Sequence, residues 1–338
     1  MNAKRGFTGF MVLLLVLLTA CTAETEQDQA STDKKLENIR VASWSQPISE
    51  QTNLLAEEEK NFFRDQGIQL TFIPGAGGAD AIKNILTDKA DIAYTDSGSL
   101  FFALDKGEKL RVIYNIYPQN VFNIVSLKEN NITQPEDLKG KTIGVYSLSS
   151  GTRQNLLLLL HEAGLTEEDV TIVETGISNF APLIQGQVDA TAATDTGLYT
   201  AKQKDLGEVN VMEVKDYLNF PSDVFVVTEE TFQEKKEILE KFLLGFRNST
   251  QWMMDNPEEA AKLAVTYAID GKDEAINLEI IKLRNAASVS EATEEKGLGA
   301  FQVDALQQAA DTYKRLGLIE NTLDMEAVVS EDLIPNKE

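Results

Sequence analysis

The sequence predicts an α/β fold with two lobes, each a mostly parallel sheet flanked by helices. Short apolar runs alternate with longer helical patterns over residues 39–94, and the same alternation begins again over residues 141–193. This order is typical of βαβ units, whose strands form parallel sheets. The chain has 338 residues, which is enough for two domains that each bury a core. We therefore expect two lobes with a related chain order.

The first alternation begins with a short apolar run. Its expected elements are a strand at 39–42, a helix at 48–66, a strand at 68–73, a helix at 79–88 and a strand at 91–94. Gly67 follows the long helical pattern, as expected for a residue just past a helix end. A glycine-rich turn from Pro74 to Gly78 leads into the second helix.

The second alternation repeats this order. Its expected elements are a strand at 141–146, a helix at 152–163, a strand at 170–174, a helix at 179–185 and a strand at 188–193. Two further apolar runs, 121–127 and 223–227, predict strands that link the two units. From Glu229 onward the pattern is mainly helical, with breaks at Pro257, Gly271 and 297–299.

The chain order indicates a discontinuous first lobe with the second lobe inserted into it. We expect lobe 1 over 38–122 and 226–338, lobe 2 over 123–225, and a two-strand hinge near Asn123 and Pro221. An internal similarity supports two related halves, because 91–98 and 189–197 both read as a strand followed by Thr-Asp, then Ser or Thr, then Gly.

The N-terminus has the features of an export signal. Lys4 and Arg5 precede an apolar run at 10–18, which is too short to span a bilayer that needs about 20 apolar residues. The Leu-Thr-Ala-Cys sequence ending at Cys21 resembles the lipobox of bacterial lipoproteins, which implies a signal peptide at 1–20 and lipidation of Cys21. A polar stretch at 21–37 reads as a flexible tether. An ordinary secretory signal with an incidental cysteine is the alternative.

Composition excludes several classes of function. The net charge of −23 argues against nucleic acid, since no excess of Lys and Arg is present to displace phosphate counterions. The single cysteine excludes an internal disulfide framework and CxxC sites. The single histidine, His161, lies near the end of a leucine-rich helix, where a structural role is favoured. We expect no catalytic residue, no metal and no cofactor.

Candidate binding residues are taken from the ends of the predicted strands, because ligands bind beyond the carboxyl ends of strands in open α/β sheets. They are Trp44, Ser45, Gln46, Gly78, Asp96, Ser97, Ser149, Ser150, Gly151, Thr152, Asp195 and Thr196. The hydroxyls at 149–152 begin a helix and suit an anion or a polar group, although ordinary capping explains them equally well. Asp96 and Asp195 are expected as helix N-caps, as cleft residues, or as both. If both face one cleft, they favour a ligand with amino groups.

Several motifs resemble those of solute-binding proteins of bacterial ABC importers. In the first half they are Gly-Gly-Ala-Asp-Ala-Ile at 77–82 and Lys-Ala-Asp-Ile-Ala at 89–93. In the second half they are 137–145, 163–165 and 186–190. The similarity is to the group that carries aliphatic sulfonates, nitrate-like solutes and pyrimidine precursors of thiamine. It implies a periplasmic-binding-protein fold whose lobes close on the solute, a permease and its ATPase as partners, a lipid anchor, and a monomer on the outer face of the membrane.

The leading hypothesis is a membrane-tethered importer receptor for a small nitrogenous solute such as an aminopyrimidine. Asp96, Asp195 and Trp44 at expected cleft positions motivate this choice. An aliphatic sulfonate or taurine-type solute is one alternative, although the turn at 150–153 departs from the commoner version in the sulfonate carriers. An enzyme or a sensor on the same two-lobed scaffold are the others, and His161 is the residue on which an enzyme would depend.

Overall fold

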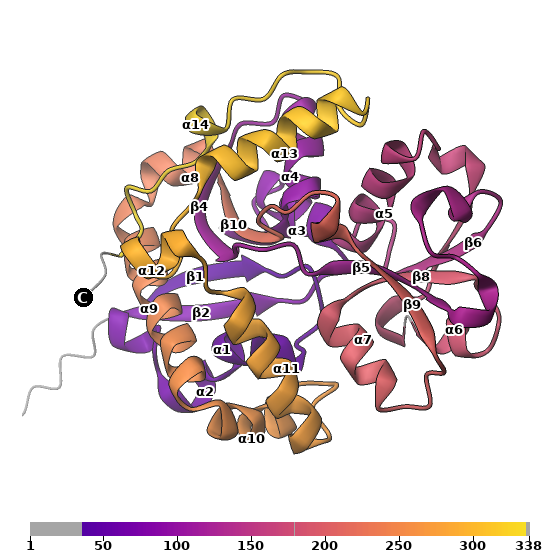
Figure 1. Ribbon diagram of the computed structural model, residues 1–338. Coiled ribbons are helices and arrows are strands. Elements are labelled where there is room, and N and C mark those ends of the chain that lie inside the picture. The colour runs from indigo at the N-terminus through magenta and orange to yellow at the C-terminus, as the bar shows by residue number, and fades with distance from the viewer. Residues whose placement is uncertain (1–35, 179, 336–338) are drawn as a thin grey trace, which may run out of the picture. The chain divides into compact units, whose positions relative to one another are not determined.

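Two five-stranded sheets organise the protein, whose computed structural model describes residues 36–178 and 180–335 (Figure 1). The first sheet has the strand order β2-β1-β3-β10-β4, and the second has the order β7-β6-β8-β5-β9. The strands of the first are β1 (Glu37–Ala42), β2 (Ile68–Ile73), β3 (Ile92–Asp96), β4 (Leu110–Tyr117) and β10 (Asp223–Thr228). Those of the second are β5 (Phe122–Leu127), β6 (Thr142–Val145), β7 (Thr171–Glu174), β8 (Ala190–Thr194) and β9 (Val209–Glu213). We call the elements around the first sheet lobe 1 and those around the second lobe 2.

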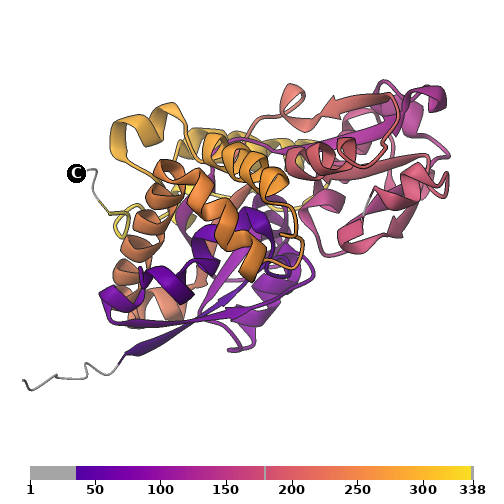
Figure 2. The ribbon, with the colours of Figure 1, turned by 90° about the horizontal axis from the view of Figure 1, so that it is seen from below.

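Helices flank both sheets, and most belong to lobe 1. Those of lobe 1 are α1 (Thr52–Leu55), α2 (Glu57–Lys60), α3 (Gly78–Leu86), α4 (Ser97–Asp105), α8 (Glu229–Glu234), α9 (Lys236–Asp255), α10 (Pro257–Tyr267), α11 (Glu274–Ala287), α12 (Glu291–Lys296), α13 (Val303–Arg315) and α14 (Met325–Val328). Lobe 2 has α5 (Gly151–Glu162), α6 (Ala181–Ile184) and α7 (Asp195–Lys202). Viewed from below, the orange helices of the C-terminal half lie with lobe 1 (Figure 2). No helix in these described residues is both long and apolar enough to cross a membrane.

The predicted fold class is confirmed, since each sheet is parallel except for one strand. In the first sheet β1 pairs parallel with β2 and β3, whereas β10 is antiparallel to β3 and β4. In the second sheet β6 pairs parallel with β7 and β8, whereas β5 is antiparallel to β8 and β9. The reversed strand in each sheet is the one that the chain enters just after it crosses between lobes.

The internal similarity seen in the sequence corresponds to equivalent positions in the two sheets. Asp91 precedes β3, and its carboxylate accepts a hydrogen bond from the backbone N–H of Arg40 at 2.8 Å. Asp189 precedes β8 and does the same for the N–H of Thr142 at 2.8 Å. Both aspartates therefore fasten the start of a strand to its parallel neighbour, and each strand then leads into a helix that begins at its carboxyl end.

One expected helix, at 48–66, is wrong as a continuous element. The segment forms a 3-10 turn, η1 (Ser49–Gln51), then the short helices α1 and α2 and a second 3-10 turn. Asn61 adopts a left-handed conformation with φ of 59°, which ends α2, and Gly67 has φ of 79° at the end of the whole segment. The break matters for the site because Glu50 lies in the 3-10 turn η1 and not on the face of a regular helix.

One hydrophobic cluster extends across both lobes. The leucines at 156–160 of α5 in lobe 2 belong to the same buried cluster as Phe101 of α4 and Tyr313 of α13 in lobe 1. His161, at the end of α5, places Nδ1 2.9 Å from the carbonyl oxygen of Leu316 in lobe 1. Its position agrees with the predicted structural role. The chain crosses between the lobes at 118–121 and 214–222.

Candidate functional site

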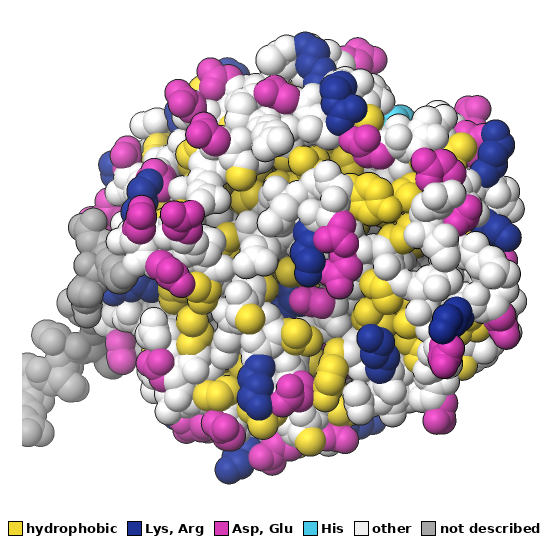
Figure 3. Space-filling model, viewed as in Figure 1, with side chains coloured by type: hydrophobic (Ala, Val, Ile, Leu, Met, Phe, Trp, Pro, Cys, Tyr) yellow, Lys and Arg dark blue, Asp and Glu magenta, His cyan; other side chains and the backbone are white. Residues whose placement is uncertain are grey.

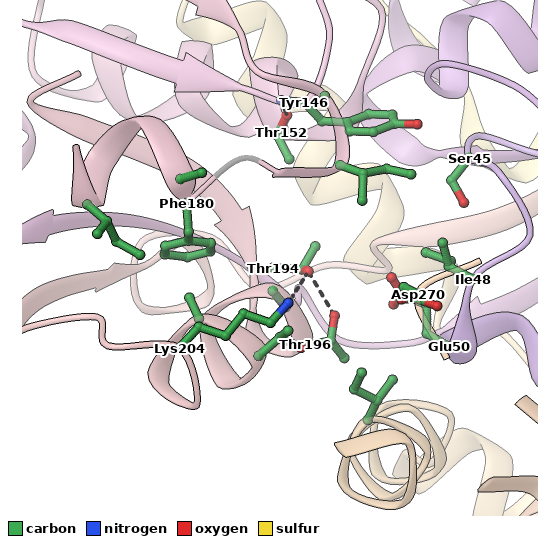
Figure 4. Close-up of a pocket in the computed structure, with 18 of the residues that line it drawn as sticks. Ser45, Ile48, Glu50, Tyr146, Thr152, Phe180, Thr194, Thr196, Lys204 and Asp270 are labelled. Atoms are coloured by element: carbon green, nitrogen blue, oxygen red, sulfur yellow. Dashed lines mark hydrogen bonds between the residues drawn. The ribbon is translucent and has the colours of Figure 1, made fainter. Parts of the chain in front are cut away.

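A cavity of about 530 Å³ lies between the lobes. Lobe 1 contributes Ser45, Ile48 and Glu50 from the segment after β1, together with Asp270 and Ile280. Lobe 2 contributes Tyr146 after β6, Thr194 and Thr196 at the start of α7, and a wall of side chains from the region of α6. Figure 4 shows Ser45, Ile48, Glu50 and Asp270 across the cavity from Phe180, Thr194 and Lys204. We call this space the outer cavity.

A smaller cavity of about 40 Å³ lies deeper between the lobes. We call it the inner cavity, and its wall includes three carboxylates, a buried arginine and the start of α5. The lining residues are Trp44, Glu50, Asp96, Val121, Phe122, Tyr146, Ser150, Gly151, Thr152, Thr194, Asp223 and Arg284. Trp44, Glu50, Tyr146, Thr152 and Thr194 line both cavities, which are therefore continuous along one side.

The inner cavity concentrates buried acidic groups from lobe 1. Glu50, Asp96 and Asp223 are 7%, 3% and 5% exposed. Asp96 caps α4 by accepting the N–H of Ser99 at 2.8 Å, and no hydrogen bond or ion pair to the Asp223 carboxylate is found among the described residues. Such groups are costly to bury as ions unless a partner approaches them.

Burial raises the pKa of all three carboxyl groups. The pKa of Asp96 rises to about 6 because of burial, despite the hydrogen bonds from Ser99. The pKa of Asp223 lies well above its usual range because of burial and the nearby charges of Asp96 and Glu50. The pKa of Glu50 is also raised by burial, although the Arg284 guanidinium opposes the shift. Burial therefore favours the neutral form of each carboxyl group.

Arg284 is the buried cation of this site. Its side chain is 1% exposed and comes from α11 of lobe 1. Nε lies 3.1 Å from a carboxylate oxygen of Glu50, and Nη2 forms an ion pair with Asp195 of lobe 2. The guanidinium also stacks over the ring of Tyr117, 5.1 Å from its centroid. The arginine thus joins the two lobes through two carboxylates and is already paired.

Trp44 lines both cavities and carries a donor without a partner. Its indole Nε1 is buried and has no hydrogen-bond partner. The ring makes edge contacts with Tyr94 of lobe 1 at 6.3 Å and with Tyr146 of lobe 2 at 6.4 Å. An N–H without a partner near three buried carboxyl groups forms a set of donors and acceptors that a polar ligand can complete.

The structure brings together part of the predicted site. Trp44 and Thr152 line both cavities, Ser45 and Thr196 line the outer one, and Asp96, Ser150 and Gly151 line the inner one. Gln46, Gly78, Ser97, Ser149 and Asp195 line neither cavity. Thr194, and not Asp195, caps α7 by accepting the N–H of Gly197 at 3.3 Å. The expectation of Asp195 as an N-cap is therefore wrong.

The serine-rich turn before α5 joins the lobes, and its serine hydroxyls are already hydrogen-bonded within the protein. The hydroxyls of Ser147 and Ser149 both donate to the carbonyl oxygen of Ala76 in lobe 1, the latter at 2.9 Å. In return the carbonyl of Ser149 accepts the N–H of Ala79 at 3.1 Å. Gly77, with φ of 146°, lies so close to Ser149 that a Cβ there would meet it. These contacts hold the lobes together in a closed arrangement.

The predicted hinge residues fall on different kinds of backbone. Asn123 lies inside β5 and is paired with both β8 and β9, so rotation there is opposed by the sheet on each side. Pro221 lies in the second crossing segment, where its carbonyl accepts the hydroxyl of Ser97 at 2.6 Å. The structure thus places the irregular crossings at 118–121 and 214–222, beside the predicted positions.

Sequence reasoning did not find Glu50, Asp223 or Arg284. Each comes from a different element, η1, β10 and α11, and no local motif links them. The start of a strand at Asp223 was recognised, but its side chain was not singled out. In the described part of the chain, no group of three or more His, Cys, Asp or Glu residues is arranged to hold a metal ion. The predicted lipidation site at Cys21, the signal peptide at 1–20 and nearly all of the tether at 21–37 lie outside the described residues.

Comparison with solved structures identifies the fold. The alkanesulfonate-binding protein SsuA from Xanthomonas axonopodis, bound to MOPS, has a TM-score of 0.69 and 17% identity, covering 87% of this chain and 98% of that one. A protein from Bordetella bronchiseptica has a TM-score of 0.73 and 18% identity, covering 88% and 95%. The fold is that of the periplasmic binding proteins, two lobes with a cavity between them.

The chain belongs to the NMT1/THI5-like family, whose model matches residues 48–260. The riboflavin-binding protein RibY of Chloroflexus aurantiacus is 21% identical and covers 96% of both chains. The formylaminopyrimidine-binding protein of Halalkalibacterium halodurans is 22% identical and covers 76% of this chain and 78% of that one. THI12 of Saccharomyces cerevisiae, a 4-amino-5-hydroxymethyl-2-methylpyrimidine phosphate synthase, is 22% identical and covers 67% and 70%. The family predicted from the sequence motifs is confirmed.

Proposed function

We propose that the protein is the solute-binding component of an ABC importer and that its solute is a small nitrogen heterocycle of the aminopyrimidine type. The observation that carries the proposal is the inner cavity, where Glu50, Asp96 and Asp223 are buried together beside an unpaired indole N–H. Binding without chemistry is sufficient for this role, because a solute that touches both lobes favours their closed arrangement.

The chemistry of the cavity matches an amino-substituted heteroaromatic edge. Such an edge offers N–H donors next to ring nitrogens that accept hydrogen bonds. Asp223 lines the inner cavity with a carboxyl group that can receive a donor, and Trp44 has a free N–H for an acceptor. A carboxyl group whose pKa is raised can also carry the proton itself and donate it to a ring nitrogen.

The same charges oppose the sulfonate alternative. An anion entering the inner cavity meets three buried carboxylates, and the arginine there is already paired with Glu50 and Asp195. Burying an anion beside these carboxyl groups makes their ionisation still less favourable, and Arg284 is not free to compensate the added charge. The relatives named for riboflavin and formylaminopyrimidine agree with a nitrogen heterocycle.

The synthase name of the yeast relative makes an enzyme the second candidate. The described residues that line the two cavities include no histidine and no cysteine, and His161 lies elsewhere, against Leu316. A binding role therefore fits the side chains better. We also propose that Cys21 carries a lipid, that the chain is monomeric, and that the tether places the lobes on the outer face of the membrane beside a permease and its ATPase.

Isothermal titration of the purified protein against 4-amino-5-hydroxymethyl-2-methylpyrimidine, formylaminopyrimidine, riboflavin and short alkanesulfonates tests the proposal. We expect binding by at least one nitrogen heterocycle and none by the sulfonates. Asp223→Asn should weaken that binding by about tenfold to a hundredfold, because a hydrogen bond to a charged group contributes about 1.5–3 kcal/mol. Asp216→Asn, an exposed aspartate in the same crossing segment, is the matched control. Binding by sulfonates alone would contradict the solute class and leave the importer role standing.

A further inference from the structure

The outer cavity is much larger than the recognition site proposed above. The inner cavity, at about 40 Å³, has room for only the edge of one ring, whereas the outer cavity measures about 530 Å³. Cavities of about 300–1,000 Å³ are typical of sites that enclose ligands with several rings or long substituents. A single aminopyrimidine ring held at the inner carboxylates would leave most of the outer cavity to water.

The walls of the outer cavity are mainly apolar. Lobe 1 contributes Ile48 and Ile280, and lobe 2 contributes Ile177, Phe180 and Ile184. Ile177 and Ile184 are 46% and 40% exposed, and both belong to the small set of large apolar side chains that are exposed in the described residues. Single exposed apolar residues are common, but a pair on one cavity wall facing further isoleucines marks a surface that an apolar ligand can cover.

Several polar groups of the outer cavity lie on the α7 side. Figure 4 shows the Lys204 side chain extending toward Thr194, with Thr196 beside it and Asp270 on the opposite wall. The hydroxyls of Thr194 and Thr196 lie 3.0 Å apart and bond to each other. These two hydroxyls can form hydrogen bonds with hydroxyl or carbonyl groups at one edge of a ligand. The rest of the ligand surface would then contact the isoleucines of the cavity wall.

We propose that the solute has two portions, an amino-substituted heteroaromatic edge in the inner cavity and a second, mainly apolar portion at least one ring in size that fills the outer cavity. Continuity supports a single solute, because Trp44, Tyr146 and Thr194 belong to both cavities. This inference rests on the proposed function. It adds that affinity depends on contacts of the second portion with Ile177, Phe180 and Ile184.

Titration of the full-length protein with matched probes tests the inference. The probe for the first portion alone is 4-amino-5-hydroxymethyl-2-methylpyrimidine. Thiamine carries the same ring with a second ring attached, and riboflavin presents a fused ring system with a hydroxylated chain. We expect at least one of the two larger probes to bind at least tenfold more tightly than the single ring, since each buried methylene adds about 0.8 kcal/mol.

Two variants test whether apolar contact accounts for the tighter binding of a larger probe. They are needed because thiamine is a cation, so its charge also contributes to its affinity beside carboxylates. Ile184→Ala should weaken the larger probe by roughly fivefold and leave the single ring unchanged, because only the larger probe reaches that wall. Val265→Ala removes an apolar side chain that is 45% exposed and lines neither cavity, and it should change neither affinity. Thermal unfolding of each variant confirms that it is folded.

The outcomes distinguish the two proposals. The two-portion solute is overturned if the single ring and both larger probes bind with equal affinity. It is also overturned if the Ile184→Ala variant binds all the probes as the parent does. In either case the importer role and its heterocycle remain. Absence of binding by every nitrogen heterocycle overturns the solute class and the two-portion inference together.

Discussion

The Asp195–Arg284 ion pair should stabilise the closed arrangement of the lobes. Asp195 begins α7 in lobe 2, and Arg284 lies in α11 of lobe 1, so the pair spans the two lobes. Rotation of the lobes away from each other leaves Arg284 with Glu50 alone. Asp195→Asn removes the charge and keeps the size of the side chain, and its amide oxygen still accepts the N–H of Thr196.

The magnitude follows from the burial of the two partners. Removing one member of a fully buried pair costs about 3–5 kcal/mol, because the other charge is left uncompensated. Here the Arg284 side chain is 1% exposed, but that of Asp195 is 34% exposed, and Glu50 still compensates part of the arginine charge. We therefore expect a loss of about 1–2 kcal/mol, which changes the ratio of closed to open protein by about five- to thirtyfold.

Two measurements test whether this ion pair stabilises the closed arrangement. Small-angle scattering of the solute-free variant should show a larger radius of gyration than the parent, and titration with the tightest probe should show affinity reduced in proportion to the closed fraction that is lost, since only the closed fraction binds with full strength. Glu162→Gln is the control, because Arg315–Glu162 also joins the lobes, at 2.7 Å, but is exposed on both sides and should contribute little. Equal effects of the two substitutions, or none from Asp195→Asn, would refute the reasoning.

Further predictions concern titration, a buried network and closure. Burial raises the pKa of Asp96 to about 6, so its ionisation opposes folding above that pH; urea unfolding should show the parent gaining about 1 kcal/mol relative to Asp96→Asn when the pH falls from 7.5 to 5. Asp91 is also buried, but hydrogen bonds from Arg40 and Lys235 lower its pKa to about 2. Its contribution to the free energy of unfolding is therefore lost as the pH falls from about 4 to 2. By the same urea measurement, Asp91→Asn should cost about 2–4 kcal/mol at pH 7. Gly77→Ala places a Cβ against the backbone of Ser149 in the opposite lobe, so titration should show weaker solute binding, with scattering showing a more open protein; unchanged values would contradict the proposed closure contact.

The sequence predicted the parts of the site that depend on local order. Asp96 was expected as an N-cap or a cleft residue, and it is both, because a strand that leads directly into a helix places its last side chain at the carboxyl edge of the sheet. Trp44 was found for the same reason, at the end of the first strand. The fold class followed from alternation alone, since parallel strands need helical crossovers.

The remaining residues meet only through packing of distant segments. Glu50 and Arg284 are separated by most of lobe 1 and all of lobe 2 in the sequence, and they approach because α11 packs against η1. The position of Glu50 was also hidden by the expected helix at 48–66, which the left-handed Asn61 helps to break into short turns. Asp195 was expected to face a ligand, yet it faces an arginine that no motif marked. Charge pairs between lobes leave no periodic pattern, so the sequence contains no signal for them.

The acidity of the protein has two distinct physical origins, and only one concerns the ligand. The net charge of −23 comes from 54 acidic residues against 31 basic ones, and water solvates those carboxylates that lie on the surface. Glu50, Asp96 and Asp223 differ because burial raises the pKa of each of them, so in the empty protein their ionisation opposes folding. A solute that brings N–H donors removes this cost, and a solute that brings negative charge increases it. The same carboxyl groups that weaken the empty protein therefore select the solute.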